Sequence, residues 1–184
     1  MDEGMTNYME YRVAKNTTAR DRLKRFIIIF GWSILPLMLI IVGLAVKPLT
    51  VLIYMTPVGV MIAIPFGRHQ YHMSFIEYEY ALVAGVIRMD KIYGSIKRKP
   101  WFEAKLSDMT LLAPYEGGYK TKADAFQADI RYEAASSLDS PDVYVGTYRN
   151  EEGNQCVLFF EATNKFINLA KFYNRNIVVK QTRF

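Results

Sequence analysis

Two apolar runs separated by a short break dominate the hydrophobic pattern of this chain. The first, Phe26 to Val46, contains no charged residue, and the second, Leu49 to Phe66, follows after only Lys47 and Pro48. A helix that rises about 1.5 Å per residue needs roughly 20 apolar residues to cross a hydrocarbon core about 30 Å thick. We therefore predict a transmembrane hairpin of two helices over residues 26–66.

The second run differs from the first because Pro57, Gly59 and Pro65 interrupt it. In lipid, a carbonyl freed by proline must find another partner, so kinks packed against the neighbouring helix are expected. A re-entrant second segment is the alternative. A cleaved signal peptide is excluded, since the first apolar run is too long, begins too late and is followed at once by another.

The cations that flank the runs set the expected orientation. Those expected on the cytoplasmic side are Arg20, Arg22, Lys24, Arg25 and Arg68, whereas the connecting turn has only Lys47. Because cytoplasmic loops carry the excess of Lys and Arg, both termini are predicted to be cytoplasmic. The membrane-facing runs contain no Asp, Glu, Arg or His, so transport by this chain alone is not expected.

After the hairpin the apolar period changes to two, beginning with Phe75 to Leu82. This alternation indicates a half-buried strand, and Ala84-Gly85 offers a turn into a returning strand. The strands predicted in this part of the chain are 86–92, 101–106, 109–113, 143–149 and 155–162. The spacing of four between Phe126, Ile130 and Ala134 predicts a short surface helix over 122–135.

A final amphipathic helix is predicted from the spacing of Phe166, Leu169, Ala170 and Tyr173, with Thr163 or Asn164 as its cap. An antiparallel sheet needs such a cover for its apolar face. The pattern thus predicts three parts. These are a basic lead (1–25), the helical hairpin (26–66) and a mainly β domain (75–184) closed by its C-terminal helix.

Several segments in this order resemble a known family. They are MEYRVAKNTT before the helices, EYEY and AGVIRMDKIYG after them, KRK with an aromatic residue, and FEATNKFINLAKFYN at the end. The chain resembles a family of small two-helix membrane proteins from Gram-positive, mostly anaerobic bacteria, to which no activity has been assigned. The resemblance implies a multi-pass protein of the bacterial cell membrane with a cytoplasmic pleckstrin-homology-like (PH-like) barrel or sandwich.

Composition and side-chain chemistry argue against catalysis. The chain of 184 residues is 51% hydrophobic, has a net charge of +5, and its single Cys156 excludes an intrachain disulfide. His69 and His72 could share a metal, but no cysteine or carboxylate cluster accompanies them. Glu77 and Glu79 share one strand face as alternation requires. No enzyme activity, cofactor, metal or nucleic-acid partner is therefore expected.

The functional signal that remains is the run Lys97, Arg98 and Lys99 followed by Trp101. Placed in a turn between strands, these cations could contact anionic headgroups while the indole enters the membrane interface. The alternatives are a protein-docking surface and a solvated turn whose aromatic residues serve the core.

Three functions are considered. The leading one is a non-enzymatic, membrane-anchored scaffold whose cytoplasmic domain docks a protein partner or membrane complex. The second is an anionic-lipid sensor that uses the Lys97-Arg98-Lys99 turn. The third is assembly of a homo-oligomer through the helices, because small and helix-breaking residues permit their close approach. Those residues are Gly31, Pro36, Gly43, Pro57 and Gly59.

Overall fold

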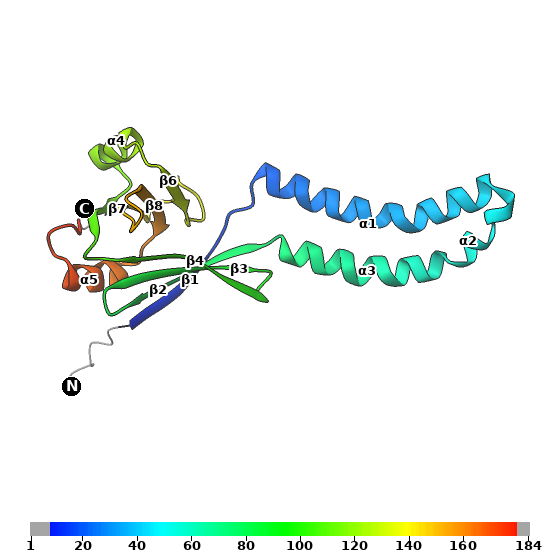
Figure 1. Cartoon of the computed structure of the whole chain (residues 1–184), viewed down its shortest axis with the longest axis horizontal. Coiled ribbons are helices and arrows are strands. Elements are labelled where there is room, and N and C mark those ends of the chain that lie inside the picture. The colour runs from blue at the N-terminus through cyan, green and yellow to red at the C-terminus, as the bar shows by residue number, and fades with distance from the viewer. Residues whose placement is uncertain (1–7, 180–184) are drawn as a thin grey trace. The chain divides into compact units, whose positions relative to one another are not determined.

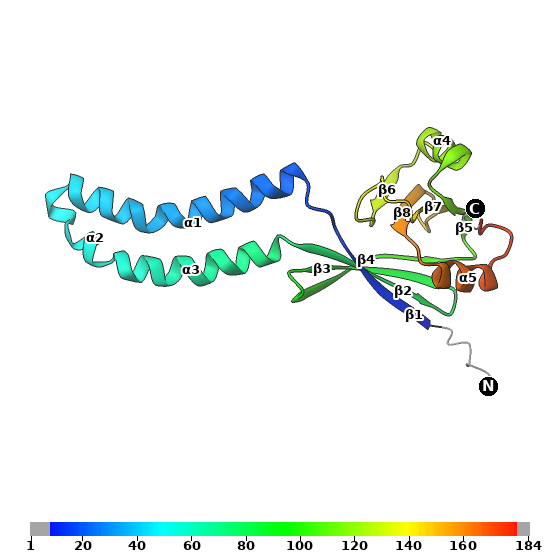
Figure 2. The ribbon, with the colours of Figure 1, turned by 180° about the vertical axis from the view of Figure 1, so that it is seen from behind.

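The computed structural model describes residues 8–179, which divide into two compact units (Figures 1 and 2). The hairpin unit comprises Thr17–Ile76 and the short segment Tyr93–Lys97. The β-domain comprises residues 8–16, Glu77–Ile92 and 98–179. Each unit has its own packing and is described by itself.

The hairpin unit consists of two antiparallel helical arms. Its helices are α1 (Ala19–Ala45), a 3₁₀ turn (Lys47–Leu49), α2 (Val51–Tyr54) and α3 (Thr56–Met73). Thr18 caps α1 by accepting from the Asp21 N–H, while the Asp21 carboxylate accepts from the Thr18 N–H. This reciprocal pair satisfies two helix donors that have no intrahelical acceptor.

The second arm differs from the predicted helix over the second apolar run. It breaks at Met55, between α2 and α3, and α3 continues to Met73, through residues that lie between the predicted hairpin (26–66) and the predicted β domain (75–184). Pro57 lies in the first turn of α3. A proline there loses no hydrogen bond because the first helical N–H groups have no intrahelical partner, so a new helix can begin at this point.

The first sheet has the order β1-β2-β3-β4. Its strands are β1 (Tyr8–Ala14), β2 (Ile76–Val83), β3 (Val86–Tyr93) and β4 (Lys97–Lys105). Strand β1 pairs antiparallel with β2, with Tyr11 opposite Tyr80. No strand is predicted from the sequence over residues 8–14. The alternating burial of β1 shows that Met9, Tyr11 and Val13 form one face.

The second sheet has the order β5-β7-β8-β6. Its strands are β5 (Met109–Pro114), β6 (Ile130–Glu133), β7 (Val143–Arg149) and β8 (Gln155–Glu161). The helix predicted over 122–135 is wrong, because α4 spans Gly117–Ala125 and β6 pairs parallel with β8. A spacing of four is also a multiple of two, so Ile130 and Ala134 fit a strand face equally well.

The two sheets and α5 (Asn164–Tyr173) share one aromatic core. Tyr80 of β2 contacts Phe160 of β8, and Phe166 of α5 lies 5.3 Å from Phe160, ring centroid to ring centroid. All three side chains are fully buried. Thr163 caps α5 by accepting from the Phe166 N–H, which confirms the predicted C-terminal helix.

The remaining predicted strands are confirmed in β2, β3, β4, β5, β7 and β8, with ends that shift by up to a few residues. After α5, the chain returns to the first strand of the second sheet. The Leu112 N–H donates to Ile177 O, and the Val179 N–H donates to Leu112 O. These bonds cover the outer edge of β5 and remove one open sheet edge.

Candidate functional site

The run Lys97, Arg98 and Lys99 opens strand β4, so its predicted position in a turn is wrong. The turn lies just before it, where the Ile96 N–H donates to Tyr93 O. Gly94 and Ser95 have φ of 58° and 59°. Two consecutive left-handed residues are typical of the tight hairpin turn that matches strand twist. The three cations consequently differ in their surroundings.

Arg98 is engaged by carboxylates of the sheet. Its Nη2 lies 2.6 Å from Glu79 Oε2 and its Nε lies 3.9 Å from Asp90 Oδ2. Arg12 holds the other oxygen of the same group, with Nε 2.6 Å from Glu79 Oε1. The Glu79 side chain is only 4% exposed. A buried carboxylate must be paired, so the charge of Arg98 serves the sheet.

A second carboxyl group joins this network from β1. The pKa of Glu10 is raised above its ordinary value, chiefly by its hydrogen bond with Glu79. Desolvation and the negative charge of Glu79 raise it further. Arg98 and Arg12 act in the opposite direction. Glu79, one of the two carboxylates on a shared strand face, thus belongs to a row of charged side chains across the first sheet. The other members of this charged row are Glu10, Arg12 and Arg98.

Trp101 packs within the β-domain. Lys91 Nζ lies 3.6 Å from the centroid of its indole, and the rings of Tyr78 and Tyr132 lie 5.8 and 5.4 Å away. Burial lowers the pKa of Lys91, and the nearby positive charges of Lys15 and Lys99 lower it further. Trp101 and Lys91 thus form a cation–π pair beside further basic groups.

The turn before β4 packs on the end of α3 inside the hairpin unit. The Gly94 N–H donates to Phe75 O at 2.9 Å, and a Cβ on Gly94 would lie 2.6 Å from His72 O. Ile96 is 71% exposed, and Lys97 beside it is exposed as well. The exposed side chains of Ile96 and Lys97 therefore lie beside the end of α3, at the open end of the hairpin, which we call its base.

Of the cations expected to orient the hairpin, Arg25 joins the two arms. Its Nε donates to Ser74 Oγ at 3.1 Å, its Nη1 donates to Thr17 Oγ1 at 3.2 Å, and its Cζ lies 3.7 Å from the Phe75 ring centroid. The side chains of Arg20, Arg22, Lys24 and Arg68 are exposed. Arg25 thus links the beginning of α1 to the residues that follow α3.

The two arms approach closely at glycines. A Cβ would lie 2.7 Å from Ile53 at Gly43, 3.0 Å from Leu39 at Gly59, and 3.2 Å from Trp32 at Gly67. At Gly31, by contrast, nothing lies within 4 Å. Gly43 and Gly59 therefore serve the packing of one arm on the other.

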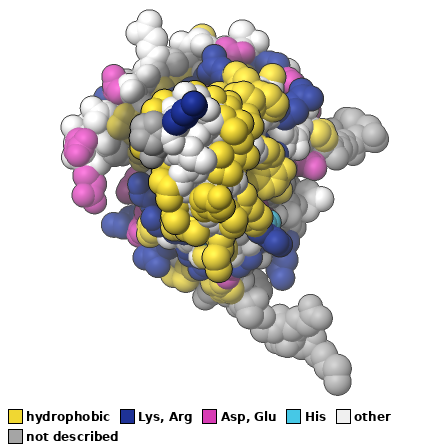
Figure 3. Space-filling view, turned by 90° about the vertical axis from the view of Figure 1, so that its right-hand side faces the viewer, with side chains coloured by type: hydrophobic (Ala, Val, Ile, Leu, Met, Phe, Trp, Pro, Cys, Tyr) yellow, Lys and Arg dark blue, Asp and Glu magenta, His cyan; other side chains and the backbone are white. Residues whose placement is uncertain are grey.

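Most large apolar side chains of the hairpin point outward (Figure 3). Exposure reaches 62% at Phe26, 71% at Leu44 and 78% at Met61. Among the described residues, α1 is the one helix long and apolar enough to cross a membrane, over 27 residues. The chain therefore carries an apolar helix near its N-terminus that suits membrane anchoring.

The groups considered for catalysis do not converge in the part of the chain that the structure describes. No group of three or more His, Cys, Asp or Glu that could hold a metal occurs there. His69 and His72 are exposed on α3. Cys156 is buried in β8, with its Sγ 3.6 Å from Asn154 O. An inert core thiol has this environment.

A hollow of about 470 Å³ lies on the β-domain beside the beginning of α5. Sequence reasoning missed it because β1 contributes part of its wall, and the hollow forms only when that strand joins the sheet. Its polar lining includes Arg12, Asp142, Glu161, Thr163 and Asn164. The Tyr11 hydroxyl donates to Glu161 O. The pKa of Tyr11 is raised, chiefly because the side chain is buried.

Comparison with known proteins identifies the family but no relative of known activity. A family model described as "Bacterial PH-like domain (DUF6106)" matches residues 5–180. Among curated proteins and solved structures, none matches the chain. PH-like domains are typically binding modules without enzymatic activity, which supports a binding or scaffold role in general. Because the match spans the helices as well as both sheets, the chain belongs to this family of bacterial PH-like domains.

Proposed function

We propose that this protein is a non-enzymatic, membrane-anchored binding module whose PH-like domain docks a protein partner at the cytoplasmic face of a bacterial cell membrane. The observation that carries the proposal is the outward-facing apolar surface of the hairpin unit. PH-like domains bind ligands of several classes, so the partner must be argued from the surface of this domain.

Both arms of the hairpin contribute to that surface. In the α2–α3 arm, Tyr54 is 76% exposed, Ile64 64% and Phe66 56%. Soluble proteins rarely expose a continuous apolar patch of this kind, because burying apolar surface away from water is favourable. We infer that the second arm also crosses the membrane, with Ile53 of α2, just before the break at Met55, packed against Gly43 of α1.

The orientation follows from the cations at the ends of the arms. Arg20, Arg22 and Lys24 lie in the first turns of α1, and the tip has Lys47. The excess of positive charge at the open end of the hairpin favours that end on the cytoplasmic side. Both termini and the PH-like domain are then cytoplasmic.

Cysteine labelling of the full chain tests this topology. In a Cys156→Ser background, Thr50→Cys places a thiol at the hairpin tip and Asn150→Cys places one in the β7–β8 turn. An impermeant maleimide should label residue 50 in intact cells and residue 150 only after lysis. Protection of residue 50 in intact cells would contradict two full crossings and favour the re-entrant alternative.

For the docking site we propose the hollow beside α5. Its volume of about 470 Å³ lies in the range of binding pockets. Its lining contains the Arg12 guanidinium, which also pairs with Glu79, and the carboxylates of Asp142 and Glu161. The side chain of Asn164 is exposed at the beginning of α5. A segment with polar side chains of both signs is the partner that such a lining fits.

Site-specific crosslinking in living cells tests the docking site. A photo-crosslinking residue at Asn164 should give one defined adduct that is lost when Asp142→Ala and Arg12→Ala are added separately. The same residue at Glu152, in the remote β7–β8 turn, is the matched control. Equal adducts at both positions, or an adduct insensitive to both substitutions, would remove this site from consideration.

The second candidate function, contact with anionic lipid, is favoured by the position of the Gly94–Ile96 turn. Because this turn packs on the end of α3, Ile96 and Lys97 lie where headgroups would surround the base of the hairpin. A cation near an anionic membrane surface contributes about 1 kcal/mol. Arg98 adds less to this contact than Lys97 because Arg98 is paired with Glu79 and lies near Asp90.

A spin label at Ile96→Cys, in a Cys156→Ser background, tests the lipid contact in nanodiscs. Power saturation should place the label at headgroup depth when the lipid is anionic. Lys97→Gln should move it toward water, whereas Lys105→Gln, at the other end of β4, should leave it unchanged. A water-exposed label in anionic nanodiscs would contradict the contact.

A further inference from the structure

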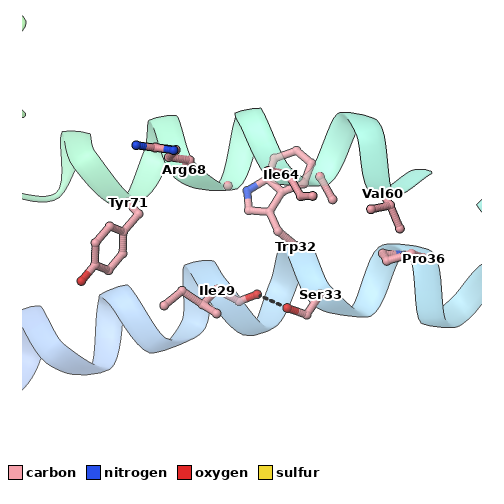
Figure 4. A pocket seen from close by; sticks show the side chains of 10 residues that line it. Ile29, Trp32, Ser33, Pro36, Val60, Ile64, Arg68 and Tyr71 are labelled. Carbon is pink, nitrogen blue, oxygen red and sulfur yellow. Dashed lines mark hydrogen bonds between the residues drawn. The ribbon is translucent and has the colours of Figure 1, made fainter. Parts of the chain in front are cut away.

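A groove of about 490 Å³ runs between α1 and α3 within the hairpin unit (Figure 4). From α1 it is lined by Ile29, Trp32, Ser33 and Pro36. The lining from α3 includes Val60, Ile64, Arg68 and Tyr71. These positions recur at intervals of three and four along each helix, so each set forms one stripe facing the other arm.

Small residues and an anchored indole give the groove its shape. Gly67 and the buried Ala63 let the Trp32 indole enter the space between the helices. Trp32 Nε1 donates to Gln70 Oε1 at 3.0 Å, which fixes the ring. The Ser33 hydroxyl is already used, because it donates to Ile29 O at 2.8 Å. The middle of the groove therefore offers apolar surface.

The groove is polar where it approaches Met73, the last residue of α3. Arg68 and Tyr71 lie there, with the guanidinium directed along α3 toward the Tyr71 end (Figure 4). Within residues 8–179, the Arg68 side chain has no ion pair or hydrogen bond. Arg25, by contrast, is held by Thr17 and Ser74. Arg68 is thus the groove-lining cation that can accept an external anion.

We propose that this groove binds one anionic phospholipid, with an acyl chain along the apolar part and the phosphate against Arg68. The inference rests on the proposed membrane hairpin. In a membrane the apolar surface alone would accept any acyl chain, and charge complementarity at Arg68 selects the anionic headgroup. Basic pockets between helices at the cytoplasmic side bind such headgroups, and the groove has the volume of a ligand site.

The position of Arg68 suits a phosphate at the membrane interface. It precedes the last residue of α3, Met73, by about 7.5 Å along the helix. A long arginine side chain at this depth reaches toward the interface. The occupant is therefore lipid rather than a second copy of the hairpin, because two copies would bring two Arg68 charges toward each other.

Lipid retained by the full-length protein tests the proposal. The protein is purified from nanodiscs of equal phosphatidylglycerol and phosphatidylcholine, and bound lipid is measured by native mass spectrometry with the oligomeric mass. We expect one retained phosphatidylglycerol per chain. Arg68→Gln should reduce its retention about fivefold, which corresponds to about 1 kcal/mol. Ser33→Phe should fill the groove and remove bound lipid of either headgroup.

Arg22→Gln is the matched control, because Arg22 lies on α1 outside the groove. This variant should retain as much phosphatidylglycerol as the parent protein does. Equal retention of both lipids, or no retained lipid, overturns the proposal while leaving the membrane hairpin standing. A dimer without lipid overturns it in favour of a second copy. Failure of the protein to enter nanodiscs at all would refute both the hairpin and the lipid site.

Discussion

The hairpin unit and the PH-like domain are both rich in apolar side chains but place them in opposite ways. In the helices of the hairpin the buried residues are Gly43, Gly59 and Ala63. In the domain, large aromatic residues such as Phe159 and Phe160 are fully buried. The hairpin therefore presents its large residues outward and packs on its small ones, whereas the domain does the reverse.

This difference follows from the solvent that each unit suits. In water, burial of large apolar side chains is the main stabilising contribution, so the domain keeps them inside. In a membrane, lipid chains are as apolar as the side chains, and helices associate through close backbone approach at small residues. Burial therefore separates two units that hydrophobicity alone would group together.

The largest effect expected from this comparison is a core truncation in the domain. Phe160→Ala should lower the free energy of unfolding by about 3–5 kcal/mol, because it removes a ring that contacts Tyr80 and Phe166 and leaves a cavity. Urea unfolding of the full chain in micelles, followed by circular dichroism, measures it. Phe172→Ala, at a side chain 61% exposed, should change the value by less than about 0.5 kcal/mol. Similar losses of stability in Phe160→Ala and Phe172→Ala would contradict the difference between buried and exposed aromatic residues in the domain.

A charge on the hairpin surface should have the next largest effect. Ile41 is 50% exposed in α1. Because an arginine near the bilayer centre costs about 2.5–3.5 kcal/mol, Ile41→Arg should reduce the fraction that resists alkaline extraction from membranes. Phe172→Arg, equally apolar-to-charged but in the domain, should leave that fraction unchanged. Full retention of Ile41→Arg would argue that this face of α1 does not meet lipid.

A smaller effect is expected at the turn that belongs to the hairpin unit. Gly94 combines a φ of 58° with a Cβ position 2.6 Å from His72 O, whereas Gly117 has φ 52° and open space. Gly117→Ala should cost about 1 kcal/mol from its conformation alone, and Gly94→Ala about 1 kcal/mol more. Thermal unfolding gives the cost, and hydrogen exchange at the turn should accelerate only in Gly94→Ala. Equal costs would show that the contact with α3 is unimportant.

The smallest effect is a pH dependence in the charged row of the first sheet. The raised pKa of Glu10 means that its contribution to stability is present at low pH and is lost as pH rises through that pKa. Glu10→Gln keeps a donor toward Glu79 at all pH values. It should therefore gain about 0.5 kcal/mol or less at pH 7, and nothing at pH 4.

Glu103→Gln is the control for sign. Glu103 pairs with Arg88 at 3.2 Å on an exposed face, so its loss should slightly lower stability at pH 7. Denaturant midpoints at pH 4 and pH 7 distinguish the two outcomes. A loss in Glu10→Gln at pH 7 would show that attraction to Arg12 and Arg98 outweighs the hydrogen bond with Glu79.

Local pattern and chain length were enough to predict several elements of the fold. Periodicity and capping depend on neighbouring residues. They were enough to predict the apolar helix from Phe26, the strand pairs β2–β3 and β7–β8, and the capped helix after Thr163. The charges flanking the apolar runs predict the topology proposed above, which the labelling experiment tests. The order of segments such as EYEY and FEATNKFINLAKFYN led to the family that the match confirms.

The contacts between residues far apart in the sequence could not be predicted from local pattern. The tertiary structure joined β1 to β2, made Glu79 the shared partner of Arg12 and Arg98, and paired β6 parallel with β8. It also turned one basic run into cations with different environments. Periodicity reports which face a residue occupies, but not what lies opposite, because pairing depends on distant segments that no local pattern encodes.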